Sequence, residues 1–161
     1  MVVNVASAVK HPGVAVPFHL LETAETMENA GEHLRFQEPI AISGEVLSTG
    51  EDILVRGTVH VSYLAACARC LTDVPVSLDI SFEEEYAKTA DDNHPDRYLY
   101  QGETLTLDQM VNDLIALQTP TRHLCNPNCR GLCPVCGADR NKETCNCRGA
   151  DPDGESPFAA D

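Results

Sequence analysis

The 161-residue chain is short of aromatic and basic side chains. It has no Trp, and aromatic residues make up 5% of it, so a core must be built mainly from Val, Leu, Ile and Ala. Eleven Lys and Arg stand against 25 Asp and Glu, which gives a formal net charge of -14. Because an acidic surface repels phosphate backbones, this charge argues against nonspecific nucleic-acid binding by the body of the protein. It favours a basic protein partner, or else serves only solubility.

Long apolar runs are also absent. Since no 18 consecutive residues are apolar, we expect no membrane-spanning helix. Residues 1–18 lack the basic start and the unbroken apolar run of a signal peptide. We therefore expect a cytoplasmic protein, in a compartment where stable disulfides are rare.

Apolar and polar residues alternate in the middle of the chain, as they do in half-buried strands. Residues 40–47, 53–64 and 74–82 are predicted strands, and residues 48–52 are a predicted turn. Before them, residues 18–21 are apolar enough to pack, and residues 23–30 are expected to form a short helix. These elements predict an antiparallel β-meander or partly open barrel.

One C-terminal helix is predicted after residue 106. Thr106 and Gln109 have the spacing of a capping box, and Pro120 ends the segment. The apolar residues between them recur at helical spacing, so the helix is expected to pack against the sheet. The fold class is therefore α+β. We expect a core domain at 1–121, a Cys-rich zinc-binding segment at 122–148 and an acidic, disordered tail at 149–161.

Eight cysteines fall into four close pairs, one on the turn between the last two strands and three after the helix. Four pairs are typical of two tetrahedral metal sites with four thiolates each. A short loop joins the last two pairs and closes easily, so we assign them to one site. The pairs are Cys67 and Cys70, Cys125 and Cys129, Cys133 and Cys136, and Cys145 and Cys147. The first two pairs then form the other site, with His123 as a substitute ligand.

Zinc is the ion that we expect at both sites. Four thiolates leave no open position for water or substrate, so the zinc should be structural and contribute on the order of 10 kcal/mol to folding. Three alternatives remain. The reducing compartment argues against disulfides, and a hairpin is the wrong place for a thioredoxin-like pair at Cys67 and Cys70. An iron–sulfur cluster also uses four thiolates.

Catalytic motifs are not evident in the sequence. There is no phosphate-binding glycine loop and no nucleophile elbow around a serine. Residues 83–85 are a run of Glu that a solvated strand face explains. We therefore expect that the protein is not an enzyme. The alternative is a hydrolase with a divalent metal in the acidic loop. Its ligands would be Asp91, Asp92, His94 and Asp96.

The order of these features resembles the YceD family of large ribosomal RNA subunit accumulation proteins. The resemblance rests on Cys67-Ala68-Arg69-Cys70-Leu71, the helix before Pro120, Cys129-Arg130-Gly131-Leu132-Cys133-Pro134-Val135-Cys136-Gly137 and Cys145-Asn146-Cys147. The long form of the family often reads Cys-Gly-x-Asn-Leu-Asn where this chain has Cys136-Gly137-Ala138-Asp139-Arg140-Asn141. The resemblance implies a non-enzymatic role in accumulation of the large-subunit (23S) ribosomal RNA and in ribosome assembly.

Two hypotheses for function follow. In the first, the acidic body binds a ribosomal protein or assembly factor of the large subunit, and the Cys-rich segment contacts ribosomal RNA. Its basic residues for that contact are Arg130, Arg140, Lys142 and Arg148. In the second, the chain is a thiol- and zinc-based redox regulator, whose C-terminal segment loses its structure when the thiols oxidise.

Overall fold

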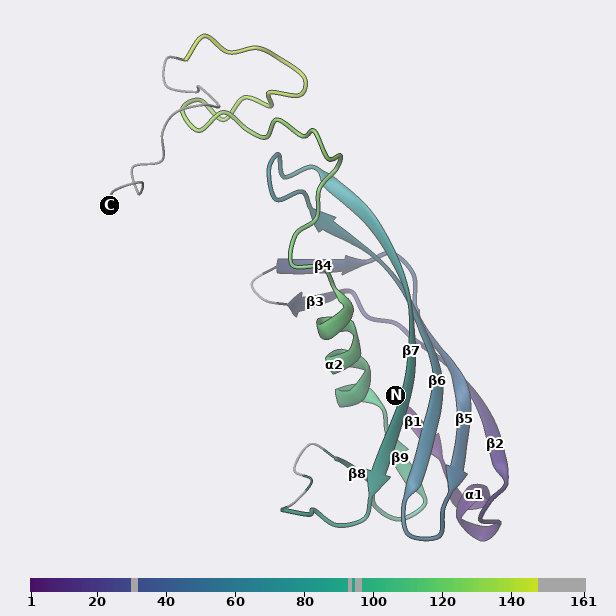
Figure 1. Cartoon of the computed structure of the whole chain (residues 1–161). Helices are drawn as coiled ribbons and strands as arrows, with labels where there is room; N and C mark the ends of the chain where they lie inside the picture. The colour runs from purple at the N-terminus through teal and green to yellow at the C-terminus, as the bar shows by residue number, and fades with distance from the viewer. Residues whose placement is uncertain (30–31, 93, 95–96, 148–161) are drawn as a thin grey trace. The chain divides into compact units, whose positions relative to one another are not determined.

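The computed structural model describes residues 1–29, 32–92, 94 and 97–147 (Figure 1). The chain divides into two compact units. The sheet unit comprises residues 1–64 and 75–120, and the cysteine unit comprises residues 65–74 and the chain from residue 121 onward. The turn that carries the first cysteine pair thus groups with the later cysteines. The domain limits expected at residues 121 and 148 stay predictions.

Strands form most of the sheet unit. They are β1 (Val2–Asn4), β2 (Ala15–Glu22), β3 (Thr26–Asn29), β4 (Glu32–Phe36), β5 (Ile40–Ser48), β6 (Ile53–Ala66), β7 (Asp73–Ala87), β8 (Tyr98–Leu99) and β9 (Thr104–Thr106). The helices are α1 (Ala6–Lys10) and α2 (Asp108–Gln118). The last residues of β6 and the first of β7 belong to the cysteine unit.

A seven-stranded open sheet is the main layer. Its order is β2-β5-β6-β4-β3, with β7 paired to β6 and β8, while β1 and β9 form a separate antiparallel pair. The β2–β5, β3–β4, β4–β6 and β5–β6 pairs are antiparallel, and β7–β8 is parallel. The prediction of a mostly antiparallel sheet is confirmed, and the sheet stays open rather than closing into a barrel (Figure 1).

The predicted alternation in the central strands matches their burial. In β6 the buried side chains are Ile53, Val55, Val59, Val61 and Tyr63, each 0% exposed. The face breaks at Gly57, which lies opposite Gly44 of β5. A Cβ on Gly44 would lie 2.2 Å from the carbonyl oxygen of Arg56. The two strands therefore approach too closely here for a side chain on either residue.

The prediction of a short helix at residues 23–30 is wrong. Thr26–Asn29 form β3, which pairs in register with β4, so that Met27 lies opposite Leu34. Ala30 lies outside the described residues. The segment carries Met27 as its one large apolar residue, so no helical stripe competes with strand pairing to the buried Leu34.

The C-terminal helix is confirmed, but its predicted capping box is wrong. The N-cap is Leu107, and no side chain caps the helix. Thr106 is held in β9 opposite Val2, and its carbonyl oxygen accepts a hydrogen bond from the Tyr86 hydroxyl at 3.3 Å. Figure 1 shows α2 alongside the sheet with its C-terminal end near β3, where the Asn29 side-chain amide donates to the Ala116 carbonyl at 3.4 Å.

Helix α2 contributes three buried side chains to the core, Met110, Val111 and Ile115. Among the described residues, no helix is long and apolar enough to span a membrane. The expected disordered tail at 149–161 lies outside the described residues.

Candidate metal centres

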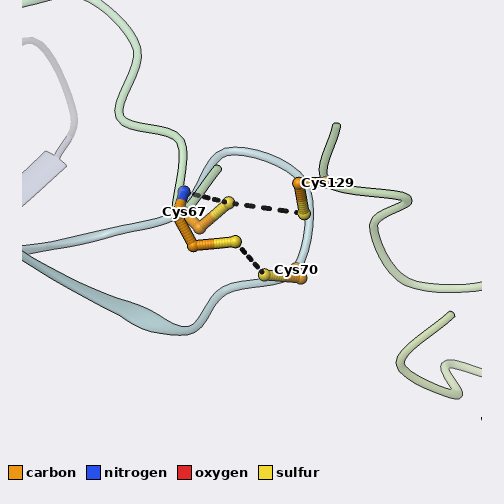
Figure 2. A group of neighbouring side chains, drawn as sticks. Cys67, Cys70 and Cys129 are labelled. Atoms are coloured by element: carbon orange, nitrogen blue, oxygen red, sulfur yellow. Dashed lines mark hydrogen bonds between the residues drawn. The ribbon is translucent and has the colours of Figure 1, made fainter. Parts of the chain in front are cut away.

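The first cysteine group, site 1, lies where the β6–β7 turn meets the segment after α2. It contains Cys67, Cys70, Cys125 and Cys129, whose sulfur atoms all lie within 4.8 Å of one another. The Cys67 and Cys129 sulfurs are 3.9 Å apart, and those of Cys70 and Cys125 are 3.6 Å apart. Figure 2 shows the side chains of Cys67, Cys70 and Cys129 converging on one space. Three of the four are buried, and Cys125 is exposed.

A tight knuckle presents the first cysteine pair. The Leu71 amide donates to the Cys67 carbonyl at 2.9 Å, and the Cys67 amide donates to the Thr72 carbonyl at 2.8 Å. Leu71 has φ 59°, a left-handed backbone conformation that residues other than glycine seldom adopt. Arg69, within the knuckle, donates from Nη1 to the Cys129 carbonyl at 2.8 Å. This bond ties the turn to the segment that supplies the other two sulfurs.

The second group, site 2, repeats this knuckle. Its sulfurs, from Cys133, Cys136, Cys145 and Cys147, also lie within 4.8 Å of one another. The Gly137 amide donates to the Cys133 carbonyl at 2.9 Å, and the Cys133 amide donates to the Ala138 carbonyl at 2.8 Å. Gly137 has φ 74° and takes the place that Leu71 has in site 1. Site 2 is more open, since Cys133 is its one buried member.

The sulfur spacing fits a tetrahedral ion with four thiolate ligands. A zinc–sulfur distance of about 2.3 Å gives a tetrahedron with edges of about 3.8 Å. The two measured separations in site 1 bracket that value. A disulfide needs about 2.05 Å between sulfurs, and all eight cysteines are free thiols. The donor set suits zinc or an iron–sulfur cluster and does not distinguish them.

Hydrogen bonds prepare site 1 for a cation. Burial opposes ionisation of Cys67, but backbone N–H groups, with that of Cys125 at 3.4 Å from its sulfur, lower the pKa of this thiol to about 6. The Thr72 side chain and amide lower the pKa of Cys70. Hydrogen bonds from the Cys125 thiol to Cys129 and Cys70 raise the pKa of Cys125 to about 12. The four sulfurs thus share protons through hydrogen bonds, and a divalent cation would take the place of those protons.

Site 2 shows the same division. Backbone N–H groups of Cys136 and Val135 lower the pKa of Cys133 to about 6. Its hydrogen bond to Cys136, burial and the negative charge of neighbouring sulfurs raise the pKa of Cys147 to about 12. The structure therefore brings together the eight cysteines in the two groups that the sequence analysis assigned. Metal binding by them stays a prediction.

The other candidate residues lie apart from these groups. His123 is buried outside them, and its carbonyl accepts a hydrogen bond from the Ala68 amide at 2.8 Å. Asp91 and Asp92 line a polar pocket in the sheet unit with Arg97. Asp96 lies outside the described residues. Within the described ranges, the groups of three or more converging ligand side chains are the two cysteine groups.

Sequence analysis missed three polar side chains that contact the sulfurs. Thr72 Oγ1 lies 3.4 Å from the Cys70 sulfur, and the Asn126 side-chain amide lies 3.5 Å from the Cys125 sulfur. Both stand within two positions of their cysteine, a signal that the sequence offered. Asn141, whose side-chain amide donates to the Cys129 sulfur at 3.4 Å, is 12 residues away and gave no local signal.

Comparison with known proteins places this arrangement in a family. The family model for the large ribosomal RNA subunit accumulation protein YceD matches residues 55–160 of this chain. A Mycobacterium tuberculosis protein is 31% identical over 147 residues, which cover 85% of this chain and 69% of that protein. The Zea mays large ribosomal RNA subunit accumulation protein YCED homolog 1, chloroplastic, is 26% identical over 166 residues, which cover 83% of this chain and 56% of that protein. No solved structure matches. The chain therefore belongs to the YceD family, as its cysteine motifs suggested.

Proposed function

We propose that this protein is a non-enzymatic cytoplasmic factor that supports accumulation of the large-subunit ribosomal RNA and assembly of the large ribosomal subunit. Two closed structural zinc sites would hold its cysteine unit together. Membership of the YceD family carries the first part of the proposal. The two groups of four converging cysteines carry the second.

The zinc part has a direct test. Four sulfurs around one ion leave no ligand position for water or substrate, so the ions would act on folding rather than on chemistry. Elemental analysis of protein purified without chelator should give two zinc per chain, and the sample should be colourless. A brown sample would indicate iron–sulfur chemistry, and absent metal with oxidised thiols would contradict the proposal.

Charge distribution supports two kinds of partner. The sheet unit carries five basic and 18 acidic side chains, which suits a basic ribosomal protein or assembly factor. In contrast, residues 65–74 and 121–148 carry six basic and three acidic side chains. Arg130 and Lys142 are exposed and Arg140 is half-buried, while Arg148 lies outside the described residues. We therefore assign ribosomal RNA contact to this part of the cysteine unit, although zinc-bound thiolates and the four acidic residues of 149–161 offset part of its charge.

Co-sedimentation tests the ribosomal part. The protein should migrate with large-subunit precursors, and its depletion should lower the ratio of large to small subunits. Replacing Arg130, Arg140 and Lys142 by Ala should weaken that association and its salt dependence. A matched control replaces Lys10, Arg35 and Arg56 of the sheet unit by Ala, which removes the same charge and should leave RNA contact intact. Unchanged subunit ratios after depletion would contradict the proposal.

The second candidate is a thiol redox regulator, favoured by the openness of site 2. Cys136 is exposed, and Cys145 and Cys147 are half-buried. Hydrogen peroxide would oxidise two of these thiolates to a disulfide, with its own reduction to two hydroxide ions and release of the metal. This candidate requires reversible zinc loss from site 2 under mild peroxide. The assembly function requires no such lability.

A further inference from the structure

The loop that closes site 2 folds back on the segment that leads out of site 1. This loop runs between Cys136 and Cys145, and the segment joins Cys129 to Cys133. Together, residues 129–133 and 138–141 form a short two-stranded ribbon. Its backbone links are the Cys133 amide to the Ala138 carbonyl at 2.8 Å, a bridge between Leu132 and Asp139, and the Arg140 amide to the Gly131 carbonyl at 3.0 Å.

Asn141 stands at the end of this ribbon with every polar group of its side chain engaged. Its amide nitrogen donates to the Cys129 sulfur at 3.4 Å and to Asp139 Oδ1 at 2.7 Å. Its amide oxygen accepts from the Arg130 backbone N–H at 2.8 Å. Because a backbone N–H must face the oxygen, the side-chain orientation is fixed, and the N–H group necessarily points to the sulfur.

A residue of the site 2 loop therefore holds a ligand of site 1. Hydrogen bonds from outside the ligand set orient a ligand and disperse its charge, and their loss lowers metal affinity by roughly 10–100-fold. Position 141 reaches the Cys129 sulfur only while the loop is folded along the ribbon. An ion at site 2 would fix that loop, since the sulfurs on either side of the loop, those of Cys136 and Cys145, lie within 4.8 Å of each other and would bind the same ion.

We propose that Asn141 couples the two metal centres, so that filling site 2 raises the affinity of site 1 for zinc. By thermodynamic linkage, filling site 1 raises the affinity of site 2 by the same factor. This inference rests on the metal part of the proposed function and goes beyond it. Metal binding at the buried site 1 then depends on the open site 2. Loss of metal from site 2 would release Asn141 and so promote loss of metal from site 1.

A double-mutant cycle on the full chain tests the coupling. Cys145→Ser with Cys147→Ser disables site 2, and Asn141→Ala removes the amide but keeps all eight ligands. Zinc affinity of site 1 is measured by competition with a chelator of known affinity. Each change should lower that affinity about tenfold, and their combination should lower it no further. Additive losses would overturn the proposal, as would full affinity at site 1 when site 2 is disabled.

Asn126→Ala is the matched control. Asn126 also directs an amide at a site 1 sulfur, that of Cys125 at 3.5 Å, but from the adjacent position in the chain. Its replacement should weaken site 1 by an amount that adds to the loss from disabling site 2, because its contact does not depend on the loop. Non-additivity for Asn126 as well would mean that disabling site 2 simply unfolds the whole unit, and would overturn a specific role of Asn141.

A spectroscopic readout separates coupling from general destabilisation. In protein loaded with cadmium-113, the side-chain amide protons of Asn141 should show scalar coupling to the ion at site 1 through the sulfur. The coupling should vanish when site 2 is disabled. Persistence of the coupling without site 2 would overturn the proposal. A chain that binds no zinc would fail both proposals, whereas two zinc with independent sites would fail this one alone.

Discussion

The two units of this chain are stabilised by different means. In the described residues, the twelve largest fully buried side chains, such as Tyr63, Leu34 and Ile115, all lie in the sheet unit. The cysteine unit buries mainly Cys67, Cys70 and Cys129. Burial of apolar area stabilises the first, but a segment this small has too little area to fold in that way. Its ligand atoms occupy the place of a core.

This difference teaches how one chain can join a domain with an apolar core to a unit whose folding we expect to depend on metal. A core side chain contributes a few kcal/mol, whereas binding of a structural zinc is itself folding free energy in the region that it orders. Perturbations of the metal and of the apolar core should therefore act on different residues. The experiments below test that separation, beginning with the largest effect.

Removal of metal should unfold the cysteine unit and spare the sheet unit. Binding energies of structural zinc are on the order of 10 kcal/mol, so a strong chelator should abolish amide protection in residues 65–74 and 121–147. Hydrogen exchange read by mass spectrometry checks this, and the amides of β5 and β6 should keep their protection. Re-addition of zinc should restore the lost protection. Equal loss in both units would show that the sheet also depends on the metal.

Truncation of a core side chain should destabilise the sheet unit and spare the cysteine unit. Ile42 is 0% exposed, and Ile42→Ala should lower the free energy of unfolding of the sheet unit by about 2–5 kcal/mol. Leu117→Ala is the control, because Leu117 is 80% exposed on α2 and should contribute little. Urea denaturation measures the change, and elemental analysis should still find two zinc per chain. Loss of zinc in Ile42→Ala would break the separation between the units.

Local sequence patterns sufficed for the long central strands and for the C-terminal helix, and they missed β2 and β4. Alternation predicted β5, β6 and most of β7, and helical spacing predicted α2, because burial of one face decides those elements. The patterns failed at β3 and at the N-cap of α2. In both, strand pairing decides the structure: β3 pairs with the adjacent β4, opposite Met27, and β1, at the other end of the chain, pairs with Thr106. The separate β1–β9 pair, of three residues a side, left no pattern to read.

Pairing of the cysteines followed from loop length, but the contacts around them did not. Close spacing indicated which sulfurs share a group, since short loops close at little entropic cost. Arg69 and Asn141 reach the site through bonds that span 60 and 12 residues, respectively. Such contacts depend on the path of the ribbon, which no periodicity encodes. Sequence therefore predicted the two cysteine groups and missed the side chains that contact them.

Two glycines of the cysteine unit should differ in their tolerance of a side chain. Gly131 and Gly137 have φ of 70° and 74°, so Ala at either should cost roughly 1–2 kcal/mol of left-handed strain. A Cβ at Gly131 would also lie 2.8 Å from the Arg69 carbonyl oxygen, while one at Gly137 meets nothing within 4 Å. Gly131→Ala should therefore release zinc to a chelator faster than Gly137→Ala does. Leu71 already adopts this conformation in the first knuckle, which supports tolerance at Gly137.

Equal zinc release by the two variants would show that backbone strain alone matters and that the close approach of Gly131 to Arg69 does not hold site 1. Chelator competition on both variants, at matched protein and zinc concentration, gives the comparison. Arg69→Ala extends the test, because loss of its bond to the Cys129 carbonyl should weaken site 1 without the backbone change.

Alkaline pH should destabilise the sheet unit and spare the cysteine unit, with the smallest effect of the four. Burial, the hydrogen bond to Asp113 and that carboxylate's charge raise the pKa of Tyr98 from 10.0 to about 12. Because the folded state favours the neutral phenol, its contribution to stability is complete below pH 10 and is lost as the pH rises to 12. Thiolates meanwhile become easier to form, so zinc binding by the cysteine unit should not weaken over that range.

Tyr98→Phe isolates this contribution. Tyr98 stacks on Tyr86 with ring centroids 5.3 Å apart, and Phe keeps the ring while it removes the titrating hydroxyl. The urea midpoint of the sheet unit should therefore fall less steeply between pH 10 and 12 in the variant than in the native chain. Tyr98 is half-buried, so screening by water keeps the difference small. An identical slope in both proteins would place the alkaline loss elsewhere, with Tyr86, whose pKa burial also raises, as the next group to replace.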